Sequence, residues 1–97
     1  MKTTELHESL NTLPLIAILR GLQPTEALAV ATALVDSGFR IIEVPLNSPQ
    51  PLKSIATIAS RFGNEVLVGA GTVLNEDQAH QVLDSGGQLL IAPNLNL

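Results

Sequence analysis

Four short apolar runs, spaced almost evenly along the 97-residue chain, constrain its fold more than any other feature. The runs are LIAIL (Leu15–Leu19), IIEV (Ile41–Val44), VLVGAG (Val66–Gly71) and LLIAP (Leu89–Pro93), and successive runs start 26, 25 and 23 positions apart. Each run is continuous and rich in Ile, Val or Leu, which is typical of strands buried on both faces of a parallel sheet. The sequence therefore predicts four parallel β-strands.

Three helical patterns separate these strands. The first helix is predicted from about Pro24 to Ser37, with proline at its first position. The second is predicted to begin with Ser48 as N-cap and Pro49 at its first position. The third is predicted to begin after Asn75 and to end at Gly86. The second helix is expected to bury Leu52, Ile55, Ala56 and Ala59, and the third Ala79, Val82 and Leu83.

The resulting β-α-β-α-β-α-β order indicates an α/β fold with right-handed crossovers. It fits either a small open doubly wound sheet or part of a (β/α)8 barrel. Because a complete barrel needs about 250 residues, the 97 residues correspond at most to four of its eight β/α units. We assign residues 13–97 to this unit and residues 1–12 to an N-terminal tail or short helix.

Composition excludes several classes of function. The chain has nine acidic and five scattered basic residues, two Phe and no Trp or Tyr, which argues against a nucleic-acid-binding surface. It has no cysteine, which excludes disulfides and thiolate catalysis. His7 and His80 lie far apart, so no metal site is predicted. The start of the chain lacks the apolar core of a signal peptide and no run is long enough to span a membrane, so we expect a cytoplasmic protein.

The residues that follow each strand are candidates for a functional site, because parallel strands present their carboxyl ends at one edge. Arg20 follows the first strand, Asn47 the second and Thr72 the third, while Pro93 ends the fourth. Glu43 lies inside the second strand and shares a face with Ile41 and Pro45 because side chains alternate along a strand.

Glu43 has two interpretations. Its carboxylate can form an ion pair with Arg20 that only satisfies two buried charges, or partial burial can raise its pKa toward values useful for acid–base catalysis. Arg20 either forms an ion pair at the surface or binds a substrate carboxylate through two parallel hydrogen bonds. Thr72, after GAG, either belongs to a tight turn or offers its hydroxyl and N–H to an anion.

The motifs LPLIAILRG, EVPLNSP, VGAGTVL and IAPN resemble, in order and spacing, those of the 2-keto-3-deoxy-6-phosphogluconate and galactonate aldolases. The resemblance implies a homotrimeric (β/α)8 barrel. It also implies a class I aldolase that cleaves a phosphorylated keto-deoxy sugar acid to pyruvate and glyceraldehyde 3-phosphate without metal or other cofactor. By the same resemblance Glu43 is the acid–base residue acting through a bound water. Arg20, Thr72, Asn47 and Pro93 are then substrate-binding residues.

Two features refine this resemblance. The gluconate branch has an arginine four residues after the glutamate, where this chain has Asn47, which favours the 6-phosphogalactonate substrate over its 6-phosphogluconate epimer. The family's Schiff-base lysine lies on the sixth strand, whereas the only lysines here are Lys2 and Lys53. We therefore expect an N-terminal half that is inactive alone and that self-associates or pairs with a C-terminal half.

Two alternatives remain at this point. The first is a non-catalytic half-barrel that binds small acids or associates with other subunits. The second is an independent flavodoxin-like module, which is disfavoured because the loop LRGLQPTE has a single glycine and provides no phosphate-binding turn.

Overall fold

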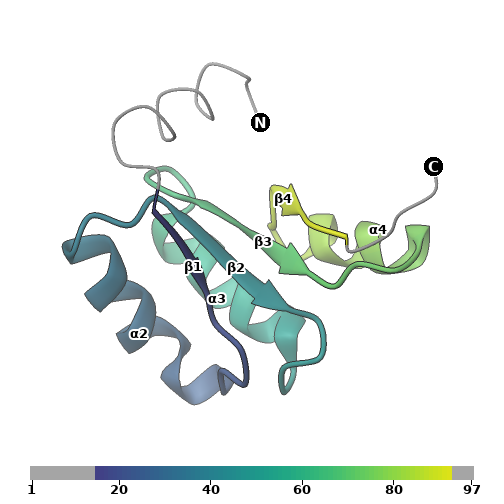
Figure 1. The fold of residues 1–97 in the computed structure, drawn as a ribbon, viewed down its shortest axis with the longest axis horizontal. Helices are drawn as coiled ribbons and strands as arrows, with labels where there is room; N and C mark the ends of the chain where they lie inside the picture. Colours follow the sequence, from purple (N-terminus) through teal and green to yellow (C-terminus); the bar gives the residue numbers. More distant parts are fainter. Residues whose placement is uncertain (1–14, 93–97) are drawn as a thin grey trace.

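The structure, a computed structural model, describes residues 15–92 of the chain. The tail predicted for residues 1–12, and Pro93, lie outside the described residues. Strands and helices alternate throughout (Figure 1). The strands are β1 (Ile16–Ile18), β2 (Ile41–Pro45), β3 (Leu67–Gly71) and β4 (Leu89–Leu90), and the helices are α2 (Pro24–Asp36), α3 (Pro51–Phe62) and α4 (Glu76–Asp84).

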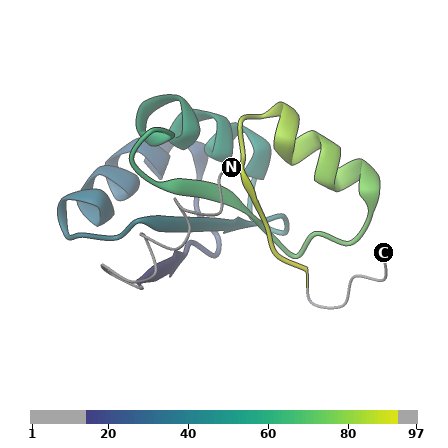
Figure 2. The same ribbon diagram turned by 90° about the horizontal axis from the view of Figure 1, so that it is seen from above.

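The four strands form one parallel sheet in the order β1-β2-β3-β4. The helices α2, α3 and α4 all pack on one face of this sheet, as the view from above shows (Figure 2). Helices on a single face of a parallel sheet in sequential order are the arrangement of consecutive units of a (β/α)8 barrel, in which the opposite face turns inward. The predicted fold class is confirmed.

The hydrophobic core lies between the sheet and the helices. From the sheet, Ile42, Val44 and Val68 are almost completely buried, and from α3, Ile55 and Ile58 are completely buried. Alternation along β2 therefore sends Ile42 and Val44 into the core and leaves the side chain between them on the other face. None of the helices within residues 15–92 is long and apolar enough to cross a membrane.

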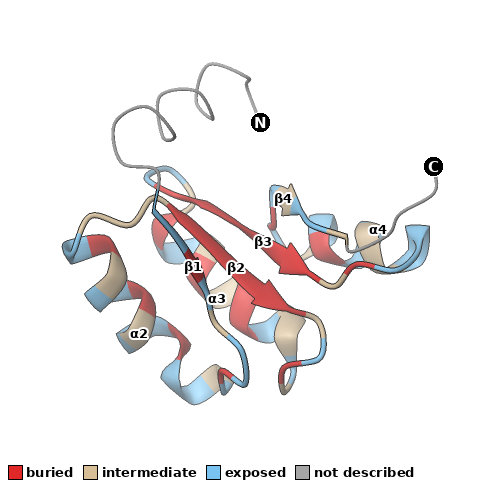
Figure 3. Ribbon diagram, in the orientation of Figure 1, coloured by how far each residue is buried: buried red, intermediate tan, exposed pale blue. Residues whose placement is uncertain are grey.

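The other face of the sheet is less evenly covered. The strands β2 and β3 are buried along their whole length, whereas β1 is exposed on this face (Figure 3). Ile16 and Ile18 of β1 are 47% and 52% exposed, and Ile91 beyond β4 is 39% exposed. The sheet therefore presents apolar side chains near both of its edges.

The prediction for the start of the second helix was wrong. Helix α3 begins at Pro51, and its N-cap is Gln50, which has a φ of 40°. A residue that precedes a proline is disfavoured in the helical region. A helix that began at Pro49 would need Gln50, which precedes Pro51, in the helical region, so the helix begins at Pro51, the last proline of SPQP.

The predicted buried faces were partly wrong. In α3 the buried residues are Ser54, Ile55, Ile58 and Phe62, while Leu52, Ala56 and Ala59 are half-buried. In α4, Val82 is buried as predicted, but Leu83 is 50% exposed. The predicted capping of α4 is confirmed: the Asn75 side chain accepts a hydrogen bond from the backbone N–H of Gln78, at 2.9 Å.

Candidate functional site

Glu43 occupies the centre of the sheet. It is the third residue of β2 and lies opposite Ile18 of β1 and Gly69 of β3 in the parallel register. The backbone carbonyl of Glu43 accepts a hydrogen bond from Leu19 N–H at 2.9 Å. The side chain is on the face opposite the core, as predicted, because its neighbours Ile42 and Val44 point into the core.

The Glu43 carboxyl group is buried and incompletely satisfied. The residue is only 6% exposed, and Oε2 accepts no hydrogen bond from the described part of the chain. Burial raises the pKa of this carboxyl above its ordinary value of 4.5, while the positive charge of Arg20 opposes the rise. A buried carboxyl without a full set of partners is a costly feature, and such groups concentrate at functional sites.

Arg20 is exposed and lies in the turn that follows β1. The interpretation of two mutually satisfied buried charges is therefore wrong, because only Glu43 is buried and its Oε2 has no partner among the described residues. Arg20 is still close enough for its charge to lower the pKa of Glu43. Its guanidinium is available at the surface for an anionic group.

Ser48 connects two of the loops at this end of the sheet, which the sequence analysis did not anticipate. Its Oγ accepts a hydrogen bond from Gly21 N–H at 3.2 Å and donates one to the Leu19 carbonyl at 3.5 Å. The sequence suggested a helix cap, and the signal that would have corrected this is the pair of prolines at 49 and 51.

Thr72 has an unusual backbone conformation directly after β3. Its φ is 58°, which is a genuine outlier for a β-branched residue. Ile91 N–H donates to the Ala70 carbonyl, whereas the Ile91 carbonyl accepts from Val73 N–H, at 2.9 and 3.1 Å. The hydrogen bonds between β3 and the segment at Ile91 thus involve Ala70 and Val73 and not Thr72. Residues with a strained backbone of this kind cluster at ligand-binding sites.

Comparison with known proteins decides the family. The family model described as KDPG and KHG aldolase matches residues 6–97, nearly the whole sequence. This chain belongs to the KDPG and KHG aldolase family. It is 50% identical over 84 residues to the 2-dehydro-3-deoxy-6-phosphogalactonate aldolase of Escherichia coli (strain K12), an alignment that covers 87% of this chain and 41% of the relative.

Solved structures agree with this assignment. A native KDPGal structure superimposes with a TM-score of 0.83 at 49% identity, over 88% of this chain and 41% of that one. A KDPG aldolase from Legionella pneumophila, holding pyruvate as a covalent carbinolamine intermediate, superimposes with a TM-score of 0.77 at 32% identity, over 84% and 39%. The chain therefore spans about two fifths of the length of these relatives.

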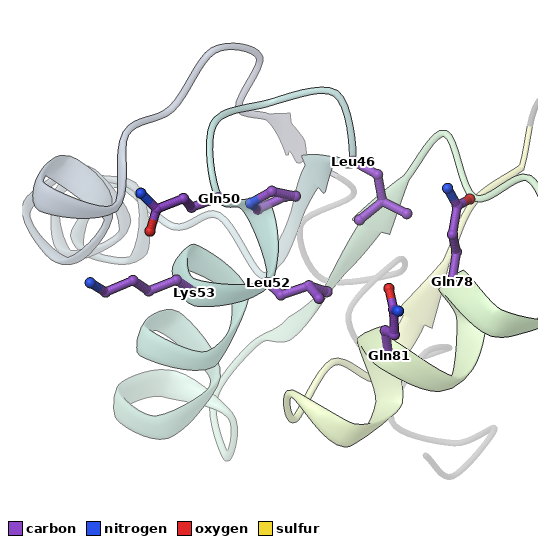
Figure 4. Close-up of a pocket in the computed structure, with 7 residues that line it drawn as sticks. Leu46, Gln50, Leu52, Lys53, Gln78 and Gln81 are labelled. Carbon is purple, nitrogen blue, oxygen red and sulfur yellow. The ribbon is translucent and has the colours of Figure 1, made fainter.

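Lys53 is the sole lysine among residues 15–92. It is exposed on α3, on the helical side of the sheet, whereas Glu43 faces the other side. Lys53 lines a groove of about 260 Å³ between α3 and α4, together with Leu46, Gln50, Pro51, Leu52, Gln78 and Gln81 (Figure 4). The groove does not include Glu43. The position of Lys53 on α3 agrees with the expectation that this lysine lies on the exterior of the barrel.

The remaining predicted site residues are less informative. Asn47 is exposed in the loop after β2, and its contact with substrate remains a prediction. Pro93 lies outside the described residues. The structure thus brings Arg20 into the neighbourhood of Glu43 and places Asn47 and Thr72 on loops at the same end of the sheet.

Proposed function

We propose that this chain supplies the acid–base half of a class I aldolase site. The complete site would cleave 2-dehydro-3-deoxy-6-phosphogalactonate to pyruvate and glyceraldehyde 3-phosphate. The observation that carries the proposal is Glu43, a buried carboxyl with an unpartnered oxygen in the middle of a parallel sheet. The kinship with aldolases supplies the reaction type.

In this reaction a lysine amine condenses with the substrate's keto carbon, expels water and forms a protonated Schiff base. The bond between C3 and C4 then breaks, its electron pair moves into the Schiff base to form an enamine, and the C4 hydroxyl loses its proton as the aldehyde departs. Glu43 takes up that proton through a bound water and returns a proton to the enamine carbon. Hydrolysis then releases pyruvate. The raised pKa of Glu43 suits a group that must both accept and donate a proton in the reaction.

The loops around Glu43 have roles in binding. Arg20 would bind the substrate carboxylate through its guanidinium, and Thr72 would offer its hydroxyl and its N–H. Asn47 and Pro93 complete the proposed contacts. We favour the galactonate epimer as the substrate because this chain is 49% identical in sequence to the KDPGal structure but 32% identical to the Legionella pneumophila KDPG aldolase.

The lysine and the phosphate site must come from outside residues 15–92. We propose that residues 13–97 form the first four β/α units of the barrel and that a C-terminal half completes it. The completed protein would work in the cytoplasm as a homotrimer. The apolar residues left exposed near the sheet edges, Ile16, Ile18 and Ile91, support such a completion.

A second candidate is a non-catalytic half-barrel that binds small acids. The observation that favours it is the position of Lys53 on the side of the sheet opposite Glu43. In that case Arg20 and Thr72 would bind a carboxylate without any covalent step. The following experiment separates the two candidates.

The 97-residue polypeptide is incubated with pyruvate and borohydride, alone and together with the C-terminal part of the Escherichia coli aldolase. Intact-mass spectrometry should show no pyruvyl adduct on the polypeptide alone. The mixture should gain an adduct on the added part and, in a separate assay without borohydride, should cleave substrate. Glu43→Gln should keep the adduct and lose most of the cleavage, and unchanged cleavage by this variant would refute the proposal.

A further inference from the structure

We infer that Ser48 is a positioning residue, whose buried hydroxyl joins the loop after β1 to the loop after β2 and thereby holds Arg20 beside Glu43. The inference rests on the proposed function only in that Arg20 is taken to bind the substrate carboxylate. Ser48 itself touches no substrate in this scheme and acts through Arg20.

The geometry of Ser48 explains why a hydroxyl is needed. The residue is 6% exposed. Its Oγ accepts from Gly21 N–H and donates to the Leu19 carbonyl, at 3.2 and 3.5 Å. These two backbone groups flank Arg20 on either side. A single atom that both donates and accepts therefore contacts the backbone immediately before and after the arginine.

The segment around Arg20 is attached at both of its ends. Leu19 N–H is held by the Glu43 carbonyl at 2.9 Å, which fixes the segment where it leaves β1. Gly21 then adopts a φ of 72°, a left-handed conformation in which the chain reverses. Beyond the turn, Leu22 is buried in the hydrophobic core. Ser48 is therefore the contact that holds the backbone of the turn itself, between these two attached ends.

Ser48 is itself held in place by β2. Its N–H donates to the Pro45 carbonyl at 3.0 Å, and the intervening Leu46 N–H donates to the Gly71 carbonyl at 2.9 Å. The hydroxyl thus projects from a short turn that is anchored to both β2 and β3. The position of Arg20 relative to Glu43 is therefore set through β2, the strand that carries Glu43.

The test follows the titration of the Glu43 carboxyl carbon by NMR in the 97-residue chain, which needs no turnover. Arg20→Gln sets the reference, because removing the positive charge should raise the titration midpoint. Ser48→Ala should raise the midpoint toward that reference, and Ser48→Thr, which keeps a hydroxyl, should restore the wild-type value. Backbone resonances of α4 report whether each variant is folded. If Ser48→Ala fails to fold, Ser48→Cys, similar in size but a weak hydrogen-bonding group, takes its place.

Two results would overturn the inference. One is a folded Ser48→Ala variant whose Glu43 midpoint equals that of wild type while Arg20→Gln shifts it. The other is an Arg20→Gln variant without any shift. In the chain completed with the C-terminal part, Ser48→Ala should raise KM several-fold with a smaller effect on kcat. Failure to cleave substrate at all would count against the proposed function but would leave the titration result intact.

Discussion

The carboxyl group of Glu43 lies against Gly71 of the neighbouring strand, in space that a Cβ at residue 71 would occupy. A Cβ built on Gly71 overlaps the carboxyl carbon and both of its oxygens. Gly71 is not among the described glycines with positive φ, so the requirement is for space and not for an unusual conformation. The glycine on β3 therefore makes room for the glutamate on β2.

Gly71→Ala is expected to destabilise the fold and to displace the Glu43 side chain. Overpacking of a buried site costs about 1–3 kcal/mol. The same substitution in a Glu43→Ala background should cost clearly less, because the overlapping carboxyl is gone. Urea unfolding of the four proteins in this double-mutant cycle measures the coupling. Equal costs in both backgrounds would show that Gly71 is needed for another reason.

The raised pKa of Glu43 predicts how stability depends on pH. The folded state binds the proton more tightly than the unfolded state, whose pKa is near the ordinary value of 4.5. The free energy of unfolding should therefore fall as pH rises from that value through the folded-state pKa, and then level off. Relative to wild type, Glu43→Gln should gain stability over this interval, because it removes the buried charge.

Urea unfolding at several pH values between about 4 and 8 would measure the difference between wild type and Glu43→Gln. Glu65→Gln provides the matched control, because Glu65 is an exposed glutamate before β3. A difference that changes in the opposite direction, with wild type gaining stability as pH rises, would contradict the expected effect of burial on Glu43.

The sequence was sufficient to predict the alternation of strands and helices along the chain and the face of the sheet on which Glu43 lies, because both follow from periodicity. The period-2 alternation of β2 puts Ile42 and Val44 into the core and Glu43 opposite, as observed. Local patterns failed where distant groups compete for the same atoms. Ser48 looked like a helix cap, but its hydroxyl binds Leu19 and Gly21 in the preceding loop.

The site was predictable to a similar degree. Glu43 stood out because a carboxylate inside an apolar run requires a reason, and Arg20 follows the adjacent strand. The strain at Thr72 was not predictable, because its positive φ depends on how Val73 pairs with Ile91 across the sheet. Leu83 was predicted to be buried from helical spacing alone, yet the residues packed around α4 leave it exposed.

The left-handed backbone of Thr72 predicts a conflict between stability and function. Strain at such a residue costs about 1–3 kcal/mol. Thr72→Gly and Thr72→Asn, which accept positive φ, should be at least as stable as wild type but should bind substrate more weakly in the completed enzyme. Thr72→Val keeps the branched side chain and loses only the hydroxyl, so it should keep the strain. Thermal unfolding of the variants tests this. A destabilised Thr72→Gly would show that the side chain contributes more than the strain removes.

Ser54 offers a stability test away from the site. Its Oγ is completely buried in α3 and has no hydrogen-bond partner among the described residues. Ser54→Ala removes an unsatisfied polar atom and improves helix propensity, so it should stabilise the fold by about 1 kcal/mol or more. Ser60→Ala, on the exposed side of the same helix, should gain only the propensity, about 0.5 kcal/mol. A larger gain at Ser60 than at Ser54 in urea unfolding would contradict this account.

The apolar residues on β1 predict that the 97-residue polypeptide associates with itself when no C-terminal half is present. Ile18 is 52% exposed on the face that a complete barrel turns inward, and β1 is an edge strand of the sheet that residues 15–92 form. Ile18→Lys should shift the polypeptide toward monomer in sedimentation velocity, since a lysine opposes edge pairing and burial. Leu28→Lys is the control, because Leu28 is 44% exposed but lies on α2, on the other side of the sheet. Each change should alter stability by no more than about 0.5 kcal/mol. If the two lysine substitutions reduce association equally, general hydrophobicity and not the β1 edge drives the association. If the wild-type polypeptide is a compact monomer, the open face of the sheet is tolerated in water.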